Sequence, residues 1–109
     1  MLGLLVSQIT WAGGGGQTGD FTIQSILVTS DDRVVVTANS AFSNPNSCNF
    51  TDALIIDRDP ANIQYKRMYQ LLLLARRVNA TVEFQVDGCV SYNDNTYPLA
   101  QEMTLKGSN

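Results

Sequence analysis

The chain contains no histidine. The side chains that we consider for chemistry are therefore its carboxylates, amides, aromatic rings and two thiols. Without histidine the chain has no Ser-His-Asp or Cys-His triad, no zinc–histidine site and no imidazole base. The close carboxylate pairs are Asp31 with Asp32 and Asp57 with Asp59. A glycosidase places two carboxylates on either side of a cleft, whereas turn and helix-cap roles explain these aspartates more simply. We therefore predict a protein that is not an enzyme and that uses no cofactor.

A second group of polar side chains follows Tyr92, namely Asn93, Asp94 and Asn95. An aromatic face beside amides suits a sugar, because the ring covers an apolar face and the amides bond hydroxyls. The alternative is an ordinary polar hairpin loop. The same segment, with Asp87 nearby, offers oxygen ligands to calcium, but neither the glycine nor the closing glutamate of an EF-hand follows. We predict no metal site.

The two cysteines, Cys48 and Cys89, are too far apart in sequence for a CxxC metal or redox pair. In a cytosolic protein they would be two unrelated buried thiols. In an exported protein an even count predicts a disulfide. A Cys48–Cys89 bridge would close a loop of about 40 residues and stabilise a small domain by about 3–4 kcal/mol in the chain-entropy model.

The first residues indicate export. Residues 1–12 hold a short apolar run that ends at Thr10-Trp11-Ala12, with small residues at the −3 and −1 positions of a signal cleavage site. The alternative is a short first strand or an amphipathic turn. The run is shorter than the about 20 residues of a membrane span, so we predict no membrane insertion. We interpret residues 13–20, which begin with four glycines, as a flexible leader. The predicted location is secreted or periplasmic.

The composition fits one domain. The chain has 109 residues, of which 44% are apolar and 16% charged, so it can bury one core and is not a disordered tail. The formal net charge is −3. Single-stranded nucleic acid is usually bound in a basic groove with several aromatic rings. The acidic balance therefore argues against a nucleic-acid partner.

The elements that must position these side chains are strands with one helix. Predicted strands cover residues 21–29, 33–38, 53–57, 81–87 and 97–105, and the helix covers 61–78. Ser30-Asp31-Asp32 joins the first two strands, residues 39–52 and 90–96 form polar loops, and residues 106–109 fray. Broken alternation at residues 26–28 predicts a bulge or a strongly bent strand. The order β-β-β-α-β-β, with a helix between the third and fourth of five strands, is that of the small OB-fold barrel.

The predicted helix begins at Asp59 as N-cap and Pro60 as first residue, and Asn79 is its C-terminal cap. Its apolar stripe is Tyr65, Met68, Leu72 and Ala75. Leu73 and Leu74 fall beside the polar face of the helix. Either loops cover these two leucines, or they contact a neighbouring subunit.

Short motifs extend from this helix to the last strand. They are Tyr65-Lys66, Leu71, Ala75-Arg76, Thr81-Val82-Glu83-Phe84-Gln85-Val86 and Thr96-Tyr97-Pro98-Leu99. Over roughly residues 20–105 the chain resembles the B subunits of subtilase cytotoxin and the related pertussis-like toxins. The resemblance implies a secreted bacterial OB-fold protein that assembles into pentamers and binds sialylated glycans on host cells. In those subunits a serine before the first strand holds the sialic acid; Gly19 stands in its place here and Asp20 keeps the pattern.

OB-folds bind ligands over their second and third strands, between the loops that join strands 1–2 and 4–5. The candidate ligand-binding residues are therefore Asp20, Asp31, Asp32, Tyr92, Asn93 and Asn95. The leading hypothesis is a glycan-binding, B-subunit-like homo-oligomer. The alternative is a secreted or periplasmic structural module that binds protein through its strand edges or through Leu73 and Leu74.

Overall fold

The computed structural model describes residues 15–57 and 63–108, which form a mainly β structure with one helix. In chain order the elements are β1 (Gly16–Gln17), β2 (Phe21–Val28), β3 (Val34–Ala38), β4 (Ala53–Ile56), α1 (Ile63–Val78), β5 (Ala80–Tyr92) and β6 (Asn95–Ser108). The order β-β-β-β-α-β-β therefore contains the predicted one, with a short additional strand in front.

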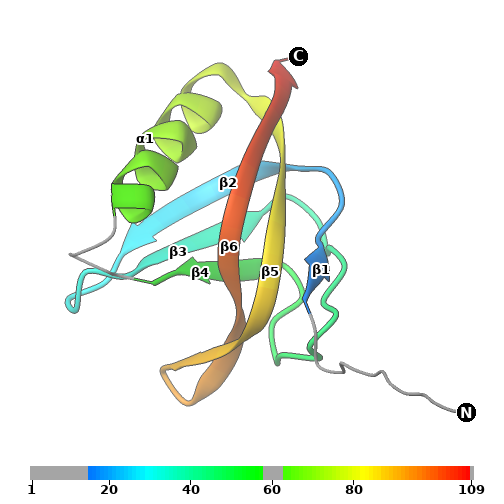
Figure 1. Ribbon diagram of the computed structural model, residues 1–109, viewed down its shortest axis with the longest axis vertical. Coiled ribbons are helices and arrows are strands. Elements are labelled where there is room, and N and C mark those ends of the chain that lie inside the picture. Colours follow the sequence, from blue (N-terminus) through cyan, green and yellow to red (C-terminus); the bar gives the residue numbers. More distant parts are fainter. Residues whose placement is uncertain (1–14, 58–62, 109) are drawn as a thin grey trace, which may run out of the picture.

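The strands close into a ring (Figure 1). β5 pairs with β2, β2 with β3, β3 with β4, β4 with β6, and β6 again with β5. All these pairings are antiparallel except that of β4 with β6, which is parallel at Ile55 and Leu99. β5 and β6 run steeply across the three shorter strands, and α1 lies beside the C-terminal half of β6 (Figure 1).

β3 and β4 are buried on both faces, which explains their uninterrupted apolar sequences. One face of each strand contributes to a central core, and the opposite face contributes to a second cluster. The central core takes Val34, Val36, Leu54 and Ile56, while the second cluster takes Val35, Ala53 and Ile55. The two strands are thus a wall shared by two packed regions.

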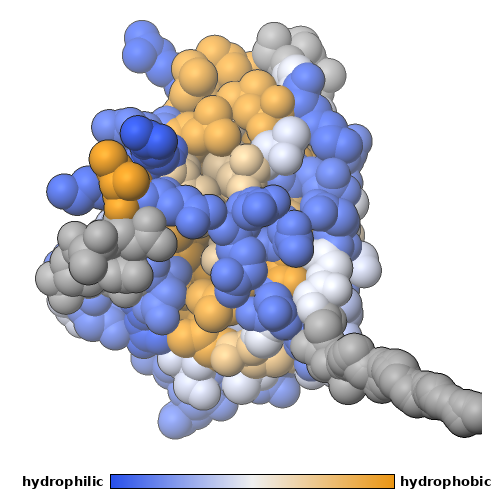
Figure 2. All heavy atoms as spheres, viewed as in Figure 1, coloured by the Kyte–Doolittle hydropathy of each residue, from blue (hydrophilic) through white to orange (hydrophobic). Residues whose placement is uncertain are grey.

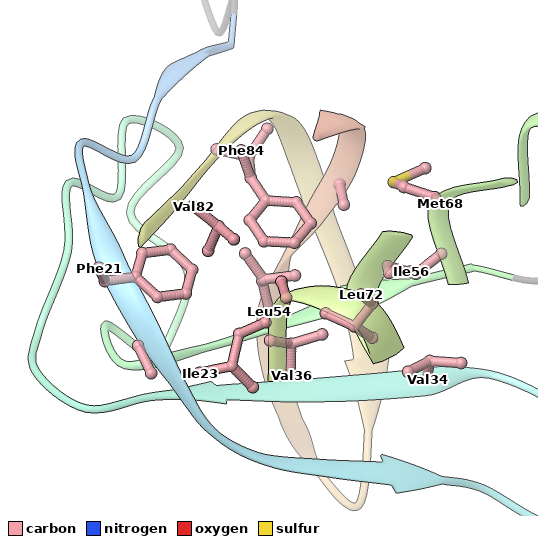
Figure 3. Close-up of a cluster of buried hydrophobic side chains, with 14 of the residues drawn as sticks. Phe21, Ile23, Val34, Val36, Leu54, Ile56, Met68, Leu72, Val82 and Phe84 are labelled. Carbon is pink, nitrogen blue, oxygen red and sulfur yellow. The ribbon is translucent and has the colours of Figure 1, made fainter. Parts of the chain in front are cut away.

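The central core gathers side chains from strands on all sides of the ring and from the helix. Figure 3 shows Phe21, Leu54, Leu72 and Phe84 pointing toward one another from β2, β4, α1 and β5. The rings of Phe21 and Phe84 stack with centroids 5.8 Å apart. Val82, Phe84 and Val86 are buried, so alternate residues of β5 face the central core.

The predicted apolar stripe and C-terminal end of the helix are confirmed. Met68, Leu72 and Ala75 are buried, and the helix ends at Val78. Asn79 has φ 54°, the left-handed conformation of a C-terminal cap. The predicted N-terminal cap, Asp59-Pro60, lies outside the described residues. Within the described part of the chain, no helix has the length and hydropathy of a membrane span.

The predicted flexible leader, residues 13–20, is wrong where the structure describes it. β1 pairs with β5, and Thr18 is buried, with its main-chain N–H donating to the carbonyl of Phe84 at 2.9 Å. A Cβ added at Gly15 would overlap the main chain of β5. This glycine therefore allows a close approach of two main chains. The predicted signal peptide, residues 1–12, lies outside the described residues.

The predicted end of this strand, β5, at residue 87 is also wrong. Gly88 takes φ 80° and the register with β6 shifts between Val86 and Cys89, so the strand kinks there and continues to Tyr92. Glycine ends a strand in many sequences, but it also permits a bulge or kink inside one. The sequence pattern does not separate these two uses.

The predicted polar loop 90–96 is consequently a tight hairpin. Asn93 and Asp94 form its two-residue turn with φ 51° and 64°, the conformation that Asn and Asp tolerate in such turns. Pro98 is buried inside β6, opposite Cys89.

Two further boundaries differ from the prediction. Residues 106–108 continue β6 instead of fraying, and Lys106 forms ion pairs with Asp20 at 3.2 Å and Glu83 at 3.1 Å. The bulge of β2 lies between Ile23 and Ser25, not at residues 26–28.

Candidate functional site

An aromatic cluster covers the face of β3 and β4 that is opposite to the central core. The buried residues Val35, Ala53, Ile55 and Tyr97 form it, with Phe50, Val90 and Tyr92 packed against them. The rings of Phe50 and Tyr97 stack with centroids 4.4 Å apart, and Tyr92 tilts against Tyr97 at 6.1 Å. The cluster therefore packs the part of the β5–β6 hairpin next to its turn, which contains Val90, Tyr92 and Tyr97, against β3 and β4.

The loop of residues 39–52 fastens this hairpin to the ring. Cys48 and Cys89 form the predicted disulfide, with Cα atoms 5.7 Å apart. Asn44 shapes the loop from inside, since its side-chain oxygen accepts from the N–H of Cys48 at 3.1 Å and its Nδ2 donates to the carbonyls of Cys48 at 2.7 Å and Phe50 at 3.1 Å. The N–H of Thr96 donates to Oδ1 of Asn49 at 2.9 Å. The loop is thus tethered at both strands of the hairpin.

Arg33 connects the β2–β3 turn to the hairpin. Its Nε and Nη2 lie 2.9 Å from Oδ2 of Asp31, and its Nη1 donates to the carbonyl of Ser91 at 3.0 Å. The guanidinium lies over the ring of Tyr92, 5.5 Å from its centroid. Only 17% of the Arg33 side chain is exposed, against 56% for Asp31. Arg33 therefore acts as a positioned bridge, while the carboxylate stays open to solvent.

The electrostatics keep Asp31 ionised. A hydrogen bond from the hydroxyl of Thr29, and then one from Arg33, lower the pKa of the Asp31 carboxyl below its usual range. By contrast, burial raises the pKa of the Tyr97 hydroxyl, and the neighbouring Tyr92 and Asp52 raise it further. At neutral pH the site thus presents the ionised carboxylate of Asp31 as an acceptor, while the hydroxyl of Tyr97 keeps its proton.

Most of the predicted ligand-binding residues come together here. Asp31 and Tyr92 share Arg33. Asn93 lies in the exposed turn next to Tyr92, and Asn95 follows that turn as the first residue of β6, with its Nδ2 donating to the carbonyl of Asn93 at 3.2 Å. Asp32 adopts φ 66° in the β2–β3 turn, and its carbonyl accepts from the hydroxyl of Tyr65 at 2.7 Å. The helix thereby fixes the turn that presents Asp31.

Asp20 does not belong to this group. It precedes β2 and pairs with Lys106 near the C-terminal end of β6. The adjoining Gly19 has φ 81°, and a Cβ added there would meet no atom within 4 Å. The six candidate residues therefore occupy two separate places in the fold.

Sequence reasoning missed Arg33, Phe50 and Tyr97 as parts of the site. Tyr97 was placed in a strand but its direction was not assigned, because the path of the hairpin over β3 and β4 depends on the kink at Gly88. Phe50 lies beside Cys48 in a loop without periodicity. Arg33 did carry a signal, since an arginine directly after Asp31-Asp32 can pair back with the turn.

Leu73 and Leu74 are exposed at 45% and 50% in this chain. Loops of the described residues therefore do not cover these two leucines. Among the described residues no group of three or more His, Cys, Asp and Glu side chains is arranged to hold a metal ion.

Comparisons with protein-family models, with curated proteins and with solved structures found no match for this chain.

Proposed function

We propose that the chain is a secreted OB-fold protein that binds a glycan between the β2–β3 turn and the tip of the β5–β6 hairpin. The observation that carries this proposal is the bridge from Asp31 through Arg33 to Tyr92. It joins the two loops between which OB-folds hold their ligands. The closed ring with a helix between β4 and β5 supports the OB-fold part of the proposal.

The chemistry of these groups suits a sugar. The ring of Tyr92 is held by contacts with the Arg33 guanidinium and with the ring of Tyr97, and because it is only half-buried it still offers an apolar surface. The exposed carboxylate of Asp31 accepts hydrogen bonds, and the amides of Asn93 and Asn95 both donate and accept them. Because Arg33 and the disulfide fix the two loops, little side-chain entropy is lost when a ligand binds.

Export is supported by the disulfide, which forms and persists in oxidising compartments. Assembly of several copies would raise the avidity of weak sugar contacts without adding a new contact. The exposed leucines of α1, Leu73 and Leu74, are the surface that we propose for contact with a second copy, and the resemblance to toxin B subunits implies a pentamer.

The test is a glycan array probed with the full chain and with matched variants. We expect specific signals for the unchanged protein and a loss of about tenfold or more in apparent affinity for Tyr92→Ala. Tyr92→Phe keeps the ring and should retain most of the binding. Asp20→Asn is the control for the segment before β2, where Asp20 pairs with Lys106, and this variant should bind the glycan like the unchanged chain.

Three outcomes would contradict the proposal. A blank array from a folded, disulfide-bonded chain would remove glycan binding. Loss of binding by Asp20→Asn with retention by Tyr92→Ala would move the sugar to the segment before β2. Equal binding by all variants would separate the sugar from both places.

A second candidate function is a structural or protein-binding module. The specific observation in its favour is that Leu73 and Leu74 are exposed side by side on α1. Native mass spectrometry of the unchanged chain and of Leu73→Glu separates the glycan-binding oligomer from the protein-binding module. A monomer that binds no sugar, and that captures a protein only while Leu73 is present, would support the module.

A further inference from the structure

The proposed sugar site is surrounded by exposed carboxylates. Asp31 lies in the β2–β3 turn, Asp94 in the turn of the β5–β6 hairpin and Asp52 directly before β4. Asp52 lies close enough to Tyr97 to raise the pKa of its hydroxyl. The site thus differs from the surface between α1 and the C-terminal half of β6, where Figure 2 shows apolar atoms gathered. Charge and hydrogen bonding, more than apolar area, therefore decide which sugars the site can hold.

Arg33 is the cation between the two turns, and Asp31 already matches its charge. Nε and Nη2 of Arg33 both lie 2.9 Å from Oδ2 of Asp31, and Nη1 donates to the carbonyl of Ser91 at 3.0 Å. Only 17% of the side chain is exposed, and the guanidinium lies over the ring of Tyr92. An acidic sugar would have to take the guanidinium from Asp31 or lie beside carboxylates of its own sign. Like charges at close range repel, so both arrangements disfavour an acidic sugar.

The carboxylate of Asp31 keeps an acceptor position for a ligand. A carboxylate has about four lone-pair sites. The hydroxyl of Thr29 donates to Oδ1, Nε of Arg33 donates to Oδ2, and Nη2 lies against the same Oδ2. Oδ1 can therefore accept one more donor, and the side chain is exposed to solvent. A sugar hydroxyl can donate to it, whereas an ionised carboxylate only accepts.

We propose that the glycan bound here ends in an uncharged sugar, one of whose hydroxyls donates to Oδ1 of Asp31, and that the site rejects sialic and uronic acids. This inference rests on the proposed function, because it assigns the class of sugar to the same site. The apolar face of the sugar would lie against the ring of Tyr92, and the amides of Asn93 and Asn95 would bond further hydroxyls. This class differs from the sialylated glycans that the resemblance to toxin B subunits implies.

The probes are immobilised glycans in matched pairs. Galactose and galacturonic acid differ only at C6, where a carboxylate replaces a hydroxymethyl group, and glucose and glucuronic acid form a second such pair. A sialylated glycan is compared with the same glycan in which an amide replaces the carboxylate. Of each pair that binds the full, disulfide-bonded chain, we expect the uncharged member to bind about tenfold or more tightly than the acid. Raising the salt concentration should narrow this difference, because salt screens repulsion between exposed charges.

Matched variants assign the preference to the carboxylates. Asp31→Asn keeps the size of the side chain and removes its charge, so the preference for the uncharged sugar should fall to about twofold. A purely structural loss would weaken both members of a pair equally. Asp94→Asn is a second variant that keeps the turn, because Asn tolerates the φ of 64° found there, and it should also lower the preference. Glu102→Gln removes a charge from β6 outside both turns and should leave the preference unchanged.

The outcomes separate this inference from the proposed function. Equal or tighter binding of the acids, lost in Tyr92→Ala, would overturn the inference and leave the glycan site in place. A preference for uncharged sugars that neither Asp31→Asn nor Asp94→Asn alters would also overturn it. Absence of binding to every glycan by the folded chain would instead remove the proposed function, and the inference with it.

Discussion

The two faces of β3 and β4 build two regions of different character. Toward the central core they present Val34, Val36 and Leu54 to a helix and to strands of the ring. Toward the other side they present Val35 and Ile55 to tyrosines, a loop and a hairpin extension. The first region is apolar and closed by packing, whereas the second is held by a disulfide and side-chain hydrogen bonds. The same two strands, β3 and β4, thus pack the main core of the fold on one face and support the candidate site on the other.

The largest expected effect comes from Leu54 and Ile55, neighbours in β4 that are both 0% exposed and point to opposite regions. Leu54→Ala should cost about 4 kcal/mol of unfolding free energy, and Ile55→Ala about 2–3 kcal/mol, because the smaller cluster beside Ile55 can collapse further. Urea unfolding followed by circular dichroism measures both. A larger loss for Ile55→Ala would reverse the proposed roles of the two faces.

The disulfide comes next. Replacing Cys48 and Cys89 together by serine should lower the unfolding free energy by about 2–4 kcal/mol. The loss should be uneven, since the hairpin tip depends on the tether while the central core does not. Hydrogen exchange should therefore quicken at residues 89–97 and stay slow at Val82 and Phe84. Uniform quickening would show that the two regions unfold as one unit.

Alkaline pH should destabilise the aromatic cluster more than the central core, because the buried Tyr97 lies in the aromatic cluster. The pKa of Tyr97 is raised by its burial, so its contribution to stability is complete below the ordinary tyrosine pKa, about 10, and is lost as pH rises through the raised value. We expect the aromatic cluster to loosen before the central core as pH rises above about 10. Tyr97→Phe should remove this difference, which fluorescence and exchange at the hairpin would detect.

The smallest expected effect on stability belongs to Tyr92. Because its ring is only half-buried, Tyr92→Ala should change the unfolding free energy by about 1 kcal/mol or less. Its effect on ligand binding should be much larger, so the two measurements together separate a binding residue from a packing residue. A loss of stability as large as that of Ile55→Ala would mark Tyr92 as part of the scaffold only.

The sequence predicted the periodic elements well and the kinks poorly. The apolar stripe of α1 was confirmed, and residues 81–87 do lie in a strand, because each of these elements follows from a single local period. The positive φ of Gly88 and the close approach at Gly15 depend on strands far away in sequence, so local patterns could not predict them. For the same reason Asp31 and Tyr92 were expected near one another from fold order alone, while Arg33, which links them, was not identified.

The most direct test of the account is a nuclear magnetic resonance titration of the disulfide-bonded chain with a glycan selected on the array. The account predicts that the Nε–H signal of Arg33 and the amides of Asp31, Tyr92 and Asn95 shift together along one binding curve, while Gly19 and Asp20 do not move. Shifts confined to residues 18–20, or no shift at Arg33 with a glycan that binds, would contradict it.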